Sequence, residues 1–156
     1  MQAQSITDTQ EIRAIIGRCQ VCTLGMVDLD GLPYVLPFNF GYDGEFLYLH
    51  SAPEGRKIGI LRQRPEVCVS FSTDHELYHR HEPVACSYGM RYRSLLMYGK
   101  VEFIEGDEDK IYGLNLIMRQ YTGRDDFNYN APAVRNVTVF RVRITRIDGR
   151  SFGFRP

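Results

Sequence analysis

The residues best suited to chemistry lie together in the stretch that covers residues 46–61. Within it, alternating aromatic and aliphatic residues lead to His50, and a short turn containing Pro and Gly then brings Arg56 and Lys57 to the start of an apolar-periodic segment. This pattern is typical of a strand, a polar turn and the beginning of a helix. Backbone N–H groups at a helix N-terminus are unpaired and carry partial positive charge, so two cations there favour a bound anion. We therefore predict a phosphate site at this turn, with His50 facing the bound molecule.

Each of these residues also has a simpler interpretation. Exposed Arg and Lys side chains are often only solvated surface, and His50 could be a strand-end histidine that is hydrogen-bonded for packing. The turn is not a nucleotide-binding P-loop, because the Gly-Lys-Ser/Thr ending of that motif is absent. His50 is nevertheless the only histidine outside the segment 74–88. A histidine titrates near neutral pH and can supply protons to a reaction.

A second group of residues has the side chains of a zinc or haem site. Cys19 and Cys22 form a Cys-x-x-Cys pattern, and His75, His79 and His81 lie close together in the sequence. A second Cys-x-x-Cys is missing, and Cys22 begins a predicted core strand, where a metal ligand is out of place. We interpret these residues as buried thiols and solvated histidines and predict no metal site.

Composition excludes several classes of function. Nineteen Lys and Arg residues balance nineteen Asp and Glu residues, which removes any global electrostatic case for binding nucleic acid or an anionic membrane. No run approaches the roughly 20 apolar residues of a membrane span, and the N-terminus lacks a signal-peptide pattern. We expect a single domain over residues 1–156 in the cytoplasm, with its four cysteines reduced.

The elements that must position the chemical residues begin with a short helix. A capping pattern followed by apolar residues at helical spacing predicts this helix over residues 7–17. Alternation then predicts strands over 22–27 and 33–40, and the prolines in the second strand favour a sheet edge or a bulge. Asp43-Gly44 predicts a hairpin turn into the strand that ends at His50.

The second half of the chain continues the alternation of strands and turns. Gly99 lies inside one predicted strand, where a bulge or a close backbone approach is expected. Residues 74–88 show no period and are predicted to form a long loop, in which we place substrate choice. The other predicted elements are a helix over 58–64, strands over 66–72, 92–104 and 137–147, and one substantial helix over 107–123. The whole is predicted to be mainly β, with about six antiparallel strands and helices as insertions.

The order of three segments resembles a known family. Residues 30–40, residues 47–52 with the following Gly55-Arg56-Lys57 turn, and residues 89–100 are similar to the pyridoxamine 5′-phosphate oxidase-related split-barrel flavoproteins. More narrowly, they resemble the nitroimidazole-resistance (nitroimidazole reductase) branch, over residues 12–150. The resemblance implies a six-stranded antiparallel split barrel over about residues 21–150 and a homodimer that binds FMN in clefts between its subunits.

Carried over to this sequence, the resemblance assigns the phosphate end of the FMN site to the turn described above. Lys57 and Arg56 would hold the phosphate. Ser51 and Ala52 would contribute hydroxyl or backbone contacts in the same turn.

The ring of the flavin is assigned to two other strands. Pro37, Phe38 and Asn39 would lie beside the isoalloxazine. Tyr92 and Ser94 match the strand that supplies further flavin contacts, with the partner subunit as one source. Oxidation of pyridoxamine is not expected, because the Arg and His signature of the true oxidases cannot be located near the C-terminus.

The resulting prediction is an FMN-dependent oxidoreductase that reduces the nitro group of 5-nitroimidazole-type compounds with electrons from an external donor. His50 would lie near the redox-active edge of the flavin and donate protons or orient the ligand. A flavin carries out the electron transfer itself, so the protein must bind the phosphate, cover the ring and place a proton donor. The alternative is a non-catalytic flavin or haem carrier or sensor on the same barrel.

Overall fold

The computed structural model describes residues 2–154, whose strands form one antiparallel sheet of eight strands. In chain order the strands are β1 (Ala3–Ile6), β2 (Cys22–Val27), β3 (Pro33–Phe38), β4 (Gly41–Tyr42), β5 (Phe46–Ser51), β6 (Glu66–Tyr78), β7 (Gly89–Ile104) and β8 (Thr138–Phe152). The helices are α1 (Thr9–Arg18), α2 (Arg56–Gln63), α3 (Asp107–Thr122) and α4 (Ala131–Asn136), with a 3₁₀ helix, η1, at Ala85–Ser87. No helix in this part of the chain is long and apolar enough to cross a membrane.

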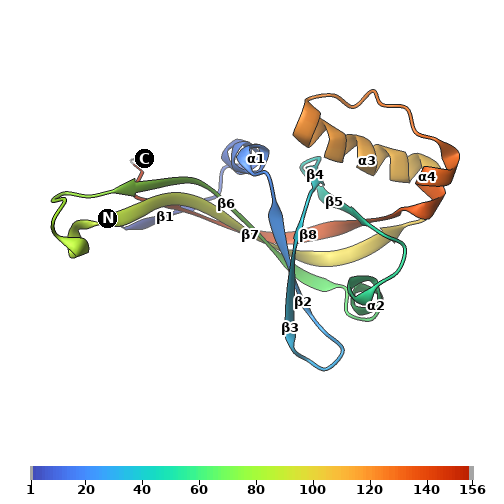
Figure 1. Ribbon diagram of the computed structural model, residues 1–156, viewed down its shortest axis with the longest axis horizontal. Coiled ribbons are helices and arrows are strands. Elements are labelled where there is room, and N and C mark those ends of the chain that lie inside the picture. The colour runs from blue at the N-terminus through green and yellow to red at the C-terminus, as the bar shows by residue number, and fades with distance from the viewer. Residues whose placement is uncertain (1, 155–156) are drawn as a thin grey trace.

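The strand order across the sheet is β3-β2-β6-β7-β8-β5-β4, and β1 pairs with β8 outside this path. The long strands β6, β7 and β8 form the centre of the sheet, and in Figure 1 the β2–β3 hairpin projects from them on one side. Helices α3 and α4 lie at the end opposite the β6–β7 connection (Figure 1). The predicted mainly β, antiparallel fold is confirmed, with the short strands β1 and β4 added to the six that were expected.

Several local predictions are confirmed by the core and the caps. The N-terminal helix is α1, in which Asp8 is the N-cap and accepts a hydrogen bond from the backbone N–H of Glu11 at 2.8 Å. Strand β3 lies at one end of the sheet, as its two prolines indicate, because an edge strand leaves one row of N–H positions unused. The core contains three fully buried phenylalanines, Phe40, Phe71 and Phe140.

Gly99 occupies a site that only glycine fits. The register between β7 and β8 shifts between Tyr98 and Gly99, which confirms the predicted bulge. A Cβ atom at this position would collide with the backbone carbonyl oxygen of Arg143. The bulge therefore depends on the missing side chain.

The predicted loop over residues 74–88 is wrong over its first five positions. Strand β6 continues to Tyr78 and β7 already begins at Gly89, and their register shifts between Thr73 and Glu76. Asp74 lies in this shift with a φ of 57°. The bulge interrupts the two-residue period, so the strand that resumes after it is hidden from pattern analysis.

A second segment, residues 124–136, is polar in sequence. In the structure, α4 occupies its last six positions. Its N-cap is Asn130, whose side-chain oxygen accepts a hydrogen bond from the N–H of Ala133 at 2.9 Å. The last strand, β8, extends to Phe152, five residues beyond its predicted end at Ile147, where it pairs with β1 and β7.

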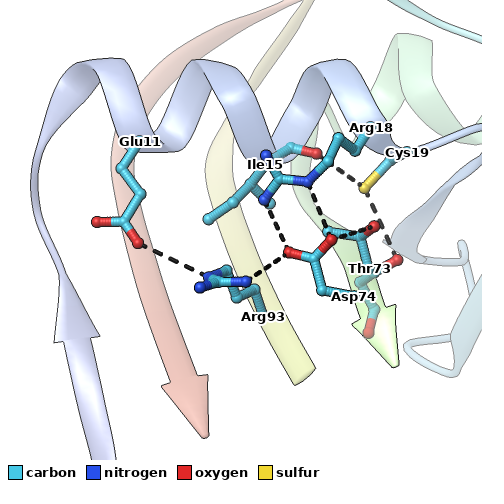
Figure 2. Close-up of polar contacts among 8 residues, drawn as sticks. Glu11, Ile15, Arg18, Cys19, Thr73, Asp74 and Arg93 are labelled. Atoms are coloured by element: carbon cyan, nitrogen blue, oxygen red, sulfur yellow. Dashed lines mark hydrogen bonds and ion pairs between the residues drawn. The ribbon is translucent and has the colours of Figure 1, made fainter. Parts of the chain in front are cut away.

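Asp74 joins the bulge to α1 and β7 (Figure 2). Its carboxylate accepts hydrogen bonds from Nε and Nη2 of Arg18 at 3.0 and 2.7 Å and from Nη1 of Arg93 at 2.9 Å. Arg93 also lies 3.9 Å from Glu11. The hydrogen bonds from Arg18, followed by those from Arg93, hold the pKa of Asp74 below its usual range. The strained residue is thus held by the helix that covers it.

Candidate functional site

A cleft with a volume of about 640 Å³ lies where four segments of the chain meet. These segments are the end of β3, the end of β5, the first turn of α2 and the junction of α4 with β8. Its lining residues are Leu36, Pro37, Phe38, Asn39, His50, Ser51, Ala52, Lys57, Ala133, Asn136 and Val137. Seven of the ten predicted flavin-binding residues are therefore brought together in one cavity.

The sheet explains why these segments meet. Strand β5 pairs with β8, so that His50 is opposite Val139 and Ser51 is opposite Thr138. The end of β3 is held from the side by Phe38, whose ring packs edge-on against Phe140 at a centroid distance of 5.9 Å. The polar groups of the cleft thus lie on paired strands and at the start of α2.

His50 lies in the cleft with an exposed side chain that forms no hydrogen bond with another described residue. Although solvent reaches it, the surrounding walls partly desolvate the imidazole and lower its pKa below the usual value. The side chain is therefore mainly neutral at pH 7. A free, titratable imidazole facing a cavity agrees better with a functional role than with packing.

Lys57 is the second residue of α2, and its side chain is half-buried. The N-cap of this helix is Gly55, with φ of 135°, and no side chain caps the first turn or adds an acidic group to it. Among residues 2–154 no carboxylate forms an ion pair with Lys57. The cleft therefore contains a cation that is not neutralised, beside an uncapped helix start.

Arg56, the other predicted phosphate ligand, does not line this cleft. Its Nη2 lies 3.1 Å from Oδ2 of Asp28, and its guanidinium stacks on the ring of Tyr34 at 4.2 Å. Asp28 is buried and also accepts hydrogen bonds from the backbone N–H groups of Leu32 and Asp30. The hydrogen bond from Leu32 lowers the pKa of the Asp28 carboxyl most, and those from Asp30 and Arg56 lower it further. The arginine thus connects α2 to the β2–β3 turn.

Tyr92 and Ser94 lie on β7, outside the cleft. Tyr92 stacks on Phe152 at a centroid distance of 5.9 Å, and Ser94 is paired with Ser72 and Arg150 in the sheet. Within one chain they do not meet the other predicted residues. Their assignment to the flavin requires a second subunit.

Four residues of the cleft were not predicted from the sequence, namely Leu36, Ala133, Asn136 and Val137. Three of them come from α4 and the residue that follows it. A signal for this helix was present, because Asn130 followed by Pro132 is a common N-cap and first-turn combination. The polar character of the segment concealed it.

The residues considered for a metal site are distributed over separate environments. Among the described residues, no group of three or more His, Cys, Asp and Glu side chains is arranged to hold a metal ion. Burial raises the pKa of the Cys22 thiol to about 12, and the Cys19 thiol donates to the carbonyl oxygen of Ile15 at 3.3 Å. His75 is hydrogen-bonded to Ser72, and His79 stacks on Tyr88.

Comparison with known families agrees with the fold. The family model described as pyridoxamine 5′-phosphate oxidase matches residues 8–151, almost the whole chain. The chain belongs to this family. No match was found among curated proteins.

One solved structure has a closely similar sequence. A candidate 5-nitroimidazole antibiotic resistance protein from Bacteroides thetaiotaomicron VPI-5482 is 47% identical, with a TM-score of 0.86 over 96% of this chain and 87% of that chain. The resemblance to the nitroimidazole-resistance branch is thus confirmed.

More distant structures share only the fold. They include the flavocytochrome Anf3 from Azotobacter vinelandii, 19% identical with a TM-score of 0.80 over 97% of this chain and 71% of that chain. An FAD and haem binding protein from Mycobacterium smegmatis is 19% identical, with a TM-score of 0.81 over 97% of this chain and 75% of that chain.

Proposed function

We propose that this protein binds FMN in the cleft and reduces the nitro group of 5-nitroimidazole-type compounds. The observation that carries the proposal is the unneutralised Lys57 in the same cavity as the free imidazole of His50. The 47% identical protein described as a candidate 5-nitroimidazole resistance protein supports this choice of substrate class.

The cleft fits such a cofactor in size and chemistry. Small-molecule and cofactor sites are usually about 300–1,000 Å³, mostly apolar, with a few polar groups that fix orientation. Here Leu36, Pro37 and Phe38 form an apolar wall, and Lys57 at the uncapped start of α2 offers a site for the phosphate. Asn39 adds an amide that can donate to or accept from the polar edge of a flavin.

The bound flavin would supply the electron transfer, after reduction by an external donor. Of the chain's own groups, Lys57 would hold the phosphate, the end of β3 would lie beside the ring, and His50 would provide a titratable proton carrier. Nitro reduction consumes protons, and the imidazolium form of His50 can donate them. Because the pKa of His50 is lowered, this form is a minority at pH 7 and increases as the pH falls.

We further propose that the working form is a homodimer in which the partner subunit completes the cofactor site. Tyr92 and Ser94 do not line the cleft of their own chain. The β2–β3 hairpin exposes a row of apolar side chains, including Leu32 and Val35 at 61% each, more than an isolated subunit normally leaves in water.

Since all four cysteines are free thiols, we place the protein in the cytoplasm, where thiols stay reduced.

The test is an absorption spectrum followed by an activity measurement. The purified protein should show flavin bands, and it should reduce a 5-nitroimidazole under anaerobic conditions with dithionite or a reductase as donor. A flavin spectrum without turnover would favour the carrier or sensor. A Soret band would indicate haem, which His50 in the cleft could ligate. Absence of any chromophore after incubation with FMN would contradict the proposal.

A further inference from the structure

Helix α4 is short but fixed at both ends. Asn130 caps its first turn, and Val134 on its inner face is only 2% exposed. At the other end, Nζ of Lys110 on α3 donates hydrogen bonds to the carbonyl oxygens of Val134 and Val137 at 3.2 and 3.0 Å. A cation at the C-terminus of a helix satisfies carbonyls that have no partner within the helix.

This arrangement presents Asn136, the last residue of α4, to the cleft. Asn136 lines the cavity and is exposed, and no hydrogen bond joins its side-chain amide to another described residue. The amide therefore has two free N–H donors on a backbone that is already held in place. Such a group can bind a ligand without breaking an existing contact.

The register of the sheet locates Asn136 along the cleft. Ser51 is opposite Thr138 in the last pair of the β5–β8 ladder, at the end of β5 that leads into the turn before α2. Asn136 precedes Thr138 by two residues and lines the same cleft as Ser51, Ala52 and Lys57. Asn136 is therefore attached to the end of the ladder from which the chain continues to Lys57.

A phosphate at this turn has several acceptor oxygens and can take further donors beside Lys57 and the free N–H groups at the start of α2. The neighbouring cation, Arg56, does not supply one, because it is occupied by Asp28 and Tyr34. We propose that Asn136 donates its amide N–H to the phosphate of the flavin and so takes the position that the sequence assigned to Arg56. This inference rests on the proposed function, because it presumes that FMN occupies the cleft.

The test compares FMN with riboflavin, which has the same ring and no phosphate. Apoprotein is titrated with each compound, and quenching of flavin fluorescence gives the two dissociation constants. We expect Asn136→Ala to weaken FMN binding about tenfold, as for loss of one hydrogen bond to a charged group, and to leave riboflavin binding unchanged. Asn136→Asp should weaken FMN binding further, because its carboxylate repels the phosphate.

The matched control is Asn128→Ala, since Asn128 is also exposed and lies outside the residues that line the cleft. It should leave both dissociation constants unchanged. Equal losses for FMN and riboflavin in Asn136→Ala would place the residue at the ring and overturn the inference, as would an unchanged FMN affinity. If the wild-type protein binds neither compound, the proposed function fails together with the inference, and that outcome differs from both of the others. Thermal unfolding of each variant checks that the fold is retained.

Discussion

Nη2 of Arg56 lies 3.1 Å from Oδ2 of Asp28, and this ion pair directs the arginine away from the cleft that contains its neighbour Lys57. Two adjacent cations in one turn thus have different surroundings. One connects secondary-structure elements, and the other faces the candidate cofactor site.

The first prediction separates these two cations by their effect on FMN affinity. Losing a charge-assisted contact to phosphate typically costs about 1.5–3 kcal/mol, or roughly 10- to 100-fold in affinity. We therefore expect Lys57→Ala to purify without flavin colour and to bind FMN at least about tenfold more weakly. Arg56→Ala should change the FMN dissociation constant much less. Equal losses in the two variants, measured by fluorescence titration, would show that Arg56 leaves Asp28 to bind the phosphate.

The second prediction concerns His50 and the nitro-reduction step. General acid–base catalysis typically contributes about 10²–10⁴-fold, so His50→Ala should lower turnover of a 5-nitroimidazole at least about tenfold while FMN stays bound. Absorption at the flavin bands checks occupancy, and anaerobic turnover with dithionite checks the rate. Unchanged turnover would make His50 a structural residue.

The third prediction follows from the lowered pKa of His50. The imidazolium form of His50 is the proton donor. Its fraction grows as the pH falls toward the pKa of His50, which lies below the usual 6.5. Wild-type turnover should therefore rise from about pH 8 to about pH 6, and the rise should be smaller in His50→Gln, which cannot titrate. Parallel profiles for the two proteins would assign the pH dependence to another group.

The fourth prediction is a pH-dependent loss of stability at Asp74. Its pKa is lowered in the folded protein, first by the hydrogen bonds from Arg18. The stabilisation is therefore fully present above the unfolded pKa, near 3.8, and is lost as the pH falls through the lower folded value. At pH 7, Asp74→Asn should lower the free energy of unfolding by about 1–2 kcal/mol, the order expected for hydrogen bonds to a charged group. Urea unfolding at several pH values measures this difference, which should shrink in acid.

Asp126→Asn is the control for this measurement. Asp126 pairs with Arg124 across two residues, and both side chains are largely exposed. Exposed pairs contribute little to stability, so this variant should unfold like the wild type. A difference for Asp74→Asn that does not depend on pH would mean that packing, and not charge, connects α1 to the bulge.

The fifth prediction concerns the homodimer and its proposed apolar surface on the β2–β3 hairpin. Val35→Asp places a charge in the exposed row on β3 and should shift the protein toward a species of about 18 kDa, with loss of flavin. Sedimentation of the loaded protein measures both. The matched control is Leu77→Asp, because Leu77 is as exposed, at 63%, but lies on β6. A wild-type protein that carries flavin as a monomer would contradict the dimer and the assignment of Tyr92 and Ser94 to the site.

Much of the fold and of the cleft could be predicted because the relevant signals are local. Alternation marked most of the strands, apolar spacing marked α1 and α3, and the prolines in β3 indicated the sheet edge. The strand, turn and helix start around His50 and Lys57 follow one another directly in the chain, so their proximity in the cleft was expected. Side chains separated by a few residues of regular backbone are positioned by that backbone alone.

The tertiary structure decided the points that depend on distant partners. Arg56 lies outside the cleft because it is bonded to the buried carboxylate of Asp28, 28 residues earlier in the chain. Asn136 lines the cleft because the hydrogen bonds from Lys110 and the pairing of β5 with β8 hold α4 beside the cleft. Neither contact leaves a periodic trace in the sequence, since periodicity records which face of an element is buried and not which partner covers it. The sequence by itself therefore determined most of the elements and the strand-turn-helix order around His50 and Lys57. The packing of the elements decided which of the neighbouring polar groups face the same cavity.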